Sequence, residues 1–90
     1  MINHDDYNRM RWASRRGLLE LDLFLEDFVV NAYPLLSDDM KTLYKELMGE
    51  ADQDLFEWLM GRSQPSDALS PIVDTIRAHK KAQAGHQVST

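Results

Sequence analysis

Four arginines, at positions 9, 11, 15 and 16, lie within eight residues, and a glycine and a run of leucines and carboxylates follow in RRGLLELD. A guanidinium presents a planar fork of donors that matches a carboxylate or a phosphate. Arg15 and Arg16 precede Gly17, where the chain is expected to turn. They are therefore candidates for binding an acidic group. The simpler alternative is that the arginines are solvated and stabilise the C-terminus of a short helix.

Glu20 is the second candidate in this segment. Helical phase places it opposite the core face, with Leu23 and Phe24 close to either side. An apolar pair around an exposed carboxylate is typical of a protein interface. The alternative is an Arg16–Glu20 pair within one helix, worth a few tenths of a kcal/mol. Gly17 between the two residues makes a continuous helix there less favourable.

The candidate residues lie in a chain that we predict to be helical, because apolar residues recur with a period of 3.6 and no strand-like alternation is present. We predict helices over residues 6–14, 18–33, 38–48 and 53–60, and a last helix up to about Lys81. The last helix begins either at Ser70-Pro71 or one turn earlier, with Asp67 as its cap. The predicted N-caps of the third and fourth helices are Ser37 and Asp52. The predicted breaks are Gly17, Pro34, Gly49 and Gly61.

The pattern predicts an all-α protein, a compact five-helix antiparallel bundle with short connections. Residues 1–90 form one domain, ordered over about 5–81, with residues 82–90 expected to be a disordered tail. In DLFEWLM, the aromatic residues Phe56 and Trp58 belong to the core more often than to a binding site. The predicted core is Leu18, Leu21, Leu25, Phe28, Leu43, Leu47, Leu55, Leu59, Ile72 and Ile76.

Composition excludes several classes of function. Ten Lys and Arg against fifteen Asp and Glu give a net charge of −5, which opposes nucleic acid as the main partner. The chain has no cysteine and three scattered histidines, so we expect no disulfide and no metal site. No apolar run approaches the roughly 20 residues of a membrane span, and the N-terminus is unlike a secretory signal. A cytoplasmic protein without a catalytic site, a phosphate-binding loop or a permanently bound cofactor is expected.

Three blocks of the sequence, WASRRGLLELD, LSDDMK and DQDLFEWLM, occur in this order in an all-helical chain without cysteine. Together they resemble the small assembly factors that promote covalent flavinylation of succinate dehydrogenase, the bacterial SdhE-like FAD assembly factors. The resemblance covers about residues 7–76 and includes the R-G-x-x-E signature. Many relatives have a proline at the position of Gln53, a departure with little expected effect on stability.

The resemblance implies a five-helix bundle that binds the flavoprotein subunit of succinate dehydrogenase and possibly that of fumarate reductase. Such a protein is no enzyme but assists its client in attaching FAD to a histidine. The signature corresponds to Arg16, Gly17 and Glu20. The implied client-binding residues are Arg16, Gly17, Glu20, Arg15, Trp12 and Asp22, beside the apolar pair Leu23 and Phe24 that helical phase indicated.

Two other functions remain open at the level of sequence. An antitoxin-like or transcript-binding module would need the segment from Arg9 to Arg16 to form a continuous basic face. A generic helical adaptor would use the same apolar and charged patch for a different protein partner.

Overall fold

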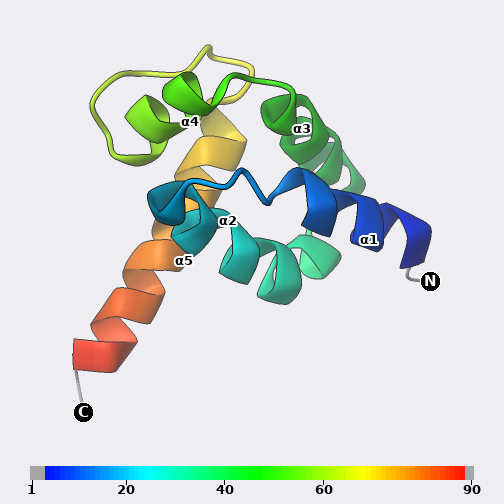
Figure 1. Cartoon of the computed structure of the whole chain (residues 1–90), viewed down its shortest axis with the longest axis horizontal. Coiled ribbons are helices and arrows are strands. Elements are labelled where there is room, and N and C mark those ends of the chain that lie inside the picture. The colour runs from blue at the N-terminus through cyan, green and yellow to red at the C-terminus, as the bar shows by residue number, and fades with distance from the viewer. Residues whose placement is uncertain (1–3, 89–90) are drawn as a thin grey trace.

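The computed structural model describes residues 4–88, the side chains of His4 and of residues 83–88 excepted. Helices joined by short connections make up this part of the chain, and it contains no strand. The all-α bundle that the sequence predicted is therefore confirmed. In Figure 1, α1 and α2 run in opposite directions and α5 passes behind the start of α2. The elements are α1 (His4–Ala13), α2 (Leu19–Asn31), the short 3-10 helix η1 (Tyr33–Leu35), α3 (Asp38–Met48), α4 (Asp52–Leu59) and α5 (Ser70–Val88).

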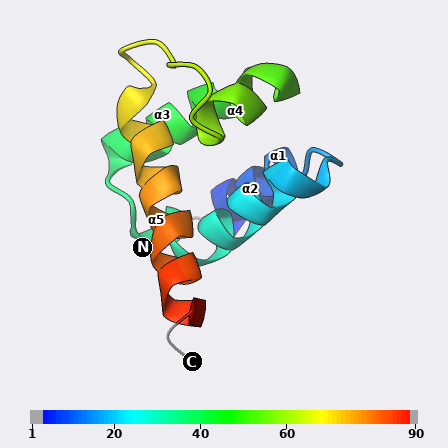
Figure 2. The same ribbon diagram turned by 90° about the vertical axis from the view of Figure 1, so that its left-hand side faces the viewer.

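Helix α2 is the centre of the bundle, because it packs against α1, α4, α5 and η1. Leu21, Leu25, Phe28 and Val29 form its buried face, and the first three of these belong to the predicted core. Helix α5 contacts α2, α3 and α4, and Figure 2 shows it lying across both the α1–α2 and the α3–α4 pairs. The two halves of the chain therefore share one core.

Aromatic side chains fill the middle of this core. Phe28 stacks on Tyr44 with ring centroids 5.6 Å apart, and Tyr33 packs against the same ring at 5.3 Å. The buried Ser14 hydroxyl donates to the Met10 carbonyl at 2.7 Å, so the Tyr44 hydroxyl is the donor in its short hydrogen bond to Ser14 Oγ. Burial raises the pKa of Tyr44 to about 12, which keeps the hydroxyl protonated. This hydrogen bond connects α1 to α3.

Most of the predicted core is confirmed, with two exceptions. Leu18 is 44% exposed because α2 begins only at Leu19, so Leu18 is the extended N-cap residue and lies outside the helical phase. Leu43 is half-buried at the edge of the core. The confirmed residues are Leu21, Leu25, Phe28, Leu47, Leu55, Leu59, Ile72 and Ile76. The prediction omitted Met10, Ser14, Val29, Tyr33, Tyr44, Met48, Leu69 and Val73.

Several helix ends differ from prediction. Helix α2 stops at Asn31 rather than residue 33, and Pro34 lies in the 3-10 turn that follows. The N-cap of α4 is Ala51 rather than Asp52, whose carboxylate faces an arginine instead. The Ser37 cap is confirmed, since its side chain accepts a hydrogen bond from the Met40 backbone. Gly61 has φ +76° at the end of α4, as expected of a terminating glycine.

Helix α5 begins at Ser70 with Pro71 in its first turn, as the first of the two predicted starts requires. It continues past Lys81 to Val88, whereas the sequence predicted a disordered tail from residue 82. The Ala-Gln-Ala stretch at 82–84 consists of residues with high helix propensity, which outweighs the missing apolar pattern. Residues 89 and 90 lie outside the described part of the chain.

The start of α1 is attached to the core by Asp6. Its carboxylate accepts a hydrogen bond from the Tyr33 hydroxyl at 2.7 Å and pairs with the Lys45 ammonium, also at 2.7 Å. Hydrogen bonds from Lys45 and Tyr33 hold the pKa of the Asp6 carboxyl below its ordinary value of 3.8. Asp6 therefore links α1, η1 and α3 in its ionised form.

Acid should weaken this link and destabilise the fold. Because the pKa of Asp6 is lowered in the folded state, its contribution is complete above pH 3.8 and is lost as the pH falls through the lowered value. We predict that the free energy of unfolding of Asp6→Asn depends less on pH between about pH 5 and pH 2 than that of the unsubstituted protein. Urea titrations across this range measure the difference, with the exposed Asp5→Asn as control. Equal acid sensitivity of Asp6→Asn and the unsubstituted protein would contradict the assignment.

Candidate functional site

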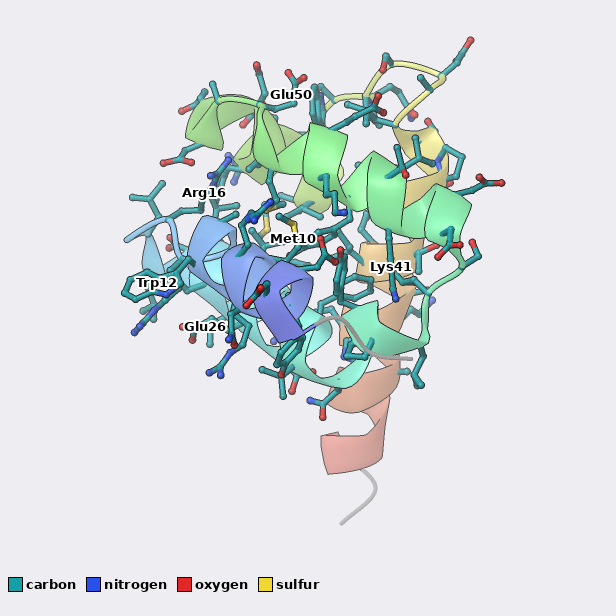
Figure 3. The ribbon with its side chains drawn as sticks, turned by 90° about the vertical axis from the view of Figure 1, so that its right-hand side faces the viewer. Met10, Trp12, Arg16, Glu26, Lys41 and Glu50 are labelled. Atoms are coloured by element: carbon teal, nitrogen blue, oxygen red, sulfur yellow. The ribbon has the colours of Figure 1, made fainter. Side chains whose placement is uncertain are left out.

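The guanidinium of Arg16 lies between the ends of three helices (Figure 3). Its Nη2 donates to the carbonyls of Met48 at 2.7 Å and Glu50 at 2.9 Å, and its Nη1 donates to the carbonyl of Ala13 at 3.2 Å. Its Nε lies 3.0 Å from Asp52 Oδ1, an ion pair whose N–H is not aligned for a hydrogen bond. One side chain thus joins α1, the α3–α4 connection and α4.

The electrostatics of this position are favourable. Ala13 and Met48 are the last residues of α1 and α3, where unpaired carbonyls carry partial negative charge. Only 16% of the Arg16 side chain is exposed. The fork of donors that the sequence suggested for an external acidic group is thus directed into the molecule. The alternative Arg16–Glu20 pair is not found among the described residues, where the ion-pair partner of Arg16 is Asp52.

The turn after Arg16 is fixed from two directions. The Asp22 carboxylate, in the first turn of α2, accepts a hydrogen bond from the Arg16 backbone N–H at 3.0 Å. Gly17 has φ +80°, a left-handed conformation that other residues rarely adopt. No atom lies within 4 Å of the position that a Cβ on Gly17 would occupy. The backbone at Gly17 is therefore held in one conformation with open space in front of it.

An exposed apolar surface surrounds this glycine. Leu19 is 71% exposed and Leu23, one helical turn later, is 53% exposed. Glu20 is exposed between them and forms no ion pair with any described residue. Leu19 was not selected from the sequence, although it lies outside the predicted core stripe and the same helical phase would have identified it. We call Gly17, Leu18, Leu19, Glu20 and Leu23 the turn surface.

Phe24 is not part of the turn surface. It is half-buried against the core, and the Lys80 ammonium lies 5.9 Å from its ring centroid. Of the apolar pair predicted to flank Glu20, only Leu23 faces solvent. The helical period of α2 could not distinguish Leu23 from Phe24, because it does not show where α5 packs against α2 and covers Phe24.

Trp12 and Arg15 lie beside the turn surface. The Trp12 ring is 74% exposed, and Arg15 Nε lies 3.3 Å from Glu26 Oε1. Figure 3 shows Trp12 pointing away from the core on the same side as Glu26. An open groove of about 370 Å³ runs between α1 and α2 here, lined by Asn8, Arg11, Trp12, Arg15, Glu26, Val29 and Val30. We call it the α1–α2 groove.

The described residues contain no cluster of three His, Cys, Asp or Glu side chains that could hold a metal ion. His79 Nε2 lies 2.6 Å from Asp27 Oδ2 and packs edge-on against Phe28, so this histidine has a structural environment at the α2–α5 contact. Within residues 4–88, no helix is long and apolar enough to cross a membrane. The turn surface and the α1–α2 groove are exposed apolar features that lie close to the R-G-x-x-E segment.

Residues 8–80 match a protein family described as the flavinator of succinate dehydrogenase. The chain belongs to this family. The matched segment begins within α1 and ends within α5, and it includes the Arg16 contacts, the turn surface and the α1–α2 groove.

Curated relatives in this family carry the name FAD assembly factor SdhE. One from Pseudomonas savastanoi pv. phaseolicola is 46% identical over 68 residues, covering 76% of this chain and 81% of the relative. One from Idiomarina loihiensis is 47% identical over 62 residues, with 69% of each chain covered. A relative from Legionella pneumophila (strain Lens) is 36% identical over 76 residues and covers 84% of this chain and 96% of its own length. The family resemblance seen in the three sequence blocks is thus confirmed.

The Arg16 contacts predict a stability effect of a conservative substitution. In Arg16→Lys, one ammonium cannot reach the carbonyls of Ala13, Met48 and Glu50 together, so the free energy of unfolding should fall by about 1–3 kcal/mol. The matched control is Arg15→Lys, because Arg15 is 65% exposed and its substitution should change stability by less than about 0.5 kcal/mol. Urea unfolding followed by circular dichroism measures both. If the two variants were equally stable, Arg16 would not hold the helix ends together.

Proposed function

We propose that this protein is an FAD assembly factor that binds the flavoprotein subunit of succinate dehydrogenase and promotes covalent attachment of FAD to it. The family match over residues 8–80 and the names of the curated relatives support this function. The observation that carries the binding site is the turn surface, an exposed apolar patch around a carboxylate on a backbone fixed by Arg16 and Asp22. The cytoplasm is the expected compartment.

In this proposal the client supplies the chemistry of flavin attachment. Joining FAD to a histidine requires the client to hold the reactive flavin carbon against the imidazole and to stabilise charge on the flavin ring. The turn surface offers apolar contact area and one exposed carboxylate, that of Glu20, which forms no ion pair with a described residue. The assembly factor acts by binding the client conformation that is competent for attachment more tightly than other conformations, which raises its population.

The residues of the signature have separate roles in this mechanism. Gly17 lets the partner approach the backbone, because no side chain stands in front of it. Leu19 and Leu23 contribute apolar area, and Glu20 supplies a directed polar contact. Arg16 and Asp22 are positioning residues, since they fix the conformation in which the turn surface is presented.

Substitutions on the turn surface should impair the client without unfolding the assembly factor. In Gly17→Arg the Cβ has no atom within 4 Å, but the residue has to adopt a left-handed φ, which costs about 1–2 kcal/mol. Glu20→Ala removes an exposed carboxylate that pairs with no described residue. We predict that both variants remain folded and lower covalent flavin in the succinate dehydrogenase flavoprotein. In-gel flavin fluorescence in a deletion strain measures this, with the fumarate reductase flavoprotein as a second client. Normal fluorescence with both variants would refute the site.

A matched pair of exposed leucines tests the apolar part of the surface. Leu19 is 71% and Leu35 is 85% exposed, so a glutamate at either position should change stability by less than about 0.5 kcal/mol. We predict that Leu19→Glu lowers client flavinylation several-fold, whereas Leu35→Glu, in η1, leaves it unchanged. The same fluorescence assay compares them at equal protein abundance. An equal effect of the two variants would show that apolar contact at the turn is not specific.

A further inference from the structure

The α1–α2 groove combines an apolar floor with unused positive charge. Val29 and Val30 come from α2 and Trp12 from α1, and the Trp12 ring is largely exposed. Exposed tryptophan beside a groove is typical of residues that dominate a binding energy. No described part of the chain covers Trp12, so its large apolar area stays in solvent unless a partner binds.

The charges at the rim differ between its two arginines. Arg15 has an ion pair with Glu26 across the groove, so its charge is partly compensated. Arg11 stacks over the Tyr7 ring at 5.9 Å and forms no ion pair with a described residue. Its guanidinium keeps a full positive charge and its bidentate donor geometry for an external acceptor. The protein as a whole carries −5, so this rim is locally opposite in sign to the molecule.

We infer that the α1–α2 groove binds an acidic segment of the client flavoprotein, with a carboxylate on Arg11 and an apolar side chain against Trp12 and Val30. This inference rests on the proposed function and adds a second contact beside the turn surface. The segment that the groove recognises would contain an Asp or Glu next to an apolar residue. Arg11 then determines which part of the client is recognised, while the turn surface acts on its conformation.

Charge and shape favour this occupant over others. A nucleic acid would meet a strongly negative protein beyond the rim, and the phosphate contacts of Arg11 alone would be few. A single carboxylate needs only one bidentate arginine, and the apolar floor requires a partner with an apolar side chain. A protein segment supplies both.

A cross-linking experiment tests the carboxylate directly. In Arg11→Lys, the new amine keeps the positive charge, and a water-soluble carbodiimide can couple it to a carboxylate that touches it, forming an amide as the activating group leaves as a urea. Purified Arg11→Lys is mixed with the purified flavoprotein subunit, and linked peptides are identified by mass spectrometry. Arg62→Lys is the matched control, because Arg62 is also exposed but lies after α4. We expect a product joining position 11 to an Asp or Glu of the flavoprotein, and none from position 62.

Affinity measurements separate this inference from the proposed function. Arg11→Glu should weaken binding to the flavoprotein by about 10-fold or more because it places like charges together, whereas Lys81→Glu, the same charge change on exposed α5, should change it less than about 2-fold. If Arg11→Glu binds normally while Leu19→Glu does not, the groove inference is wrong and the proposed function stands. If position 11 links only to a second copy of this chain, or RNA binds the groove instead, the inference is also wrong. If the unsubstituted protein does not bind the flavoprotein, both fail.

Discussion

The contacts of the Arg16 guanidinium are the constraint on which the rest of the structure depends. A short bundle has many helix ends for its size, and each end leaves carbonyl or N–H groups without helical partners. Arg16 donates to carbonyls at the ends of α1 and α3 and faces the carboxylate at the start of α4. A planar, permanently charged group suits this position because it has several donors in fixed directions. Removing it would leave three helix ends without a shared partner.

This arrangement gives the residues of the R-G-x-x-E signature two different roles. Arg16 fixes the conformation of the turn, and Gly17 and Glu20 are exposed where we propose that the client binds. The backbone N–H of Arg16 binds Asp22 while its side chain binds the helix ends, so both sides of the turn at Gly17 are fixed before any partner arrives. A surface that is already ordered loses little conformational entropy on binding. Leu19 and Glu20 are therefore exposed on a backbone whose conformation the rest of the fold fixes. The signature is therefore a structural unit as well as the contact site that we propose.

The sequence was sufficient to predict features that depend on the geometry of a single helix, such as its buried face and its N-cap. The face of α2 that carries Leu21, Leu25 and Phe28 follows from 100° per residue, and the Ser37 cap follows from the chemistry of a helix start. The partners of Arg16 could not be predicted, because Met48 and Glu50 are more than 30 residues away and lie beside it only after folding. The same distant contact explains the error at Asp52, which pairs with Arg16 rather than capping α4.

The errors at and beside the turn surface had two causes, the start of α2 and the packing of a neighbouring helix. Leu18 looked like core because the apolar stripe was extended one residue before the helix begins, whereas the exposed Leu19 was overlooked beside it. Phe24 was assigned to the surface because the pattern of one helix does not show that α5 and Lys80 cover it. The exposed and covered residues of a small bundle are thus decided by the neighbouring helices as much as by the helix that carries them.

Amide hydrogen exchange of the protein, alone and bound to the purified flavoprotein subunit, measures whether the turn surface is the contact site. We predict that the amides of Gly17 to Glu20 exchange more slowly in the complex, while those of the connection between α4 and α5, residues 60–69, are unchanged. Protection confined to the α4–α5 connection, with unchanged exchange at Gly17 to Glu20, would contradict it.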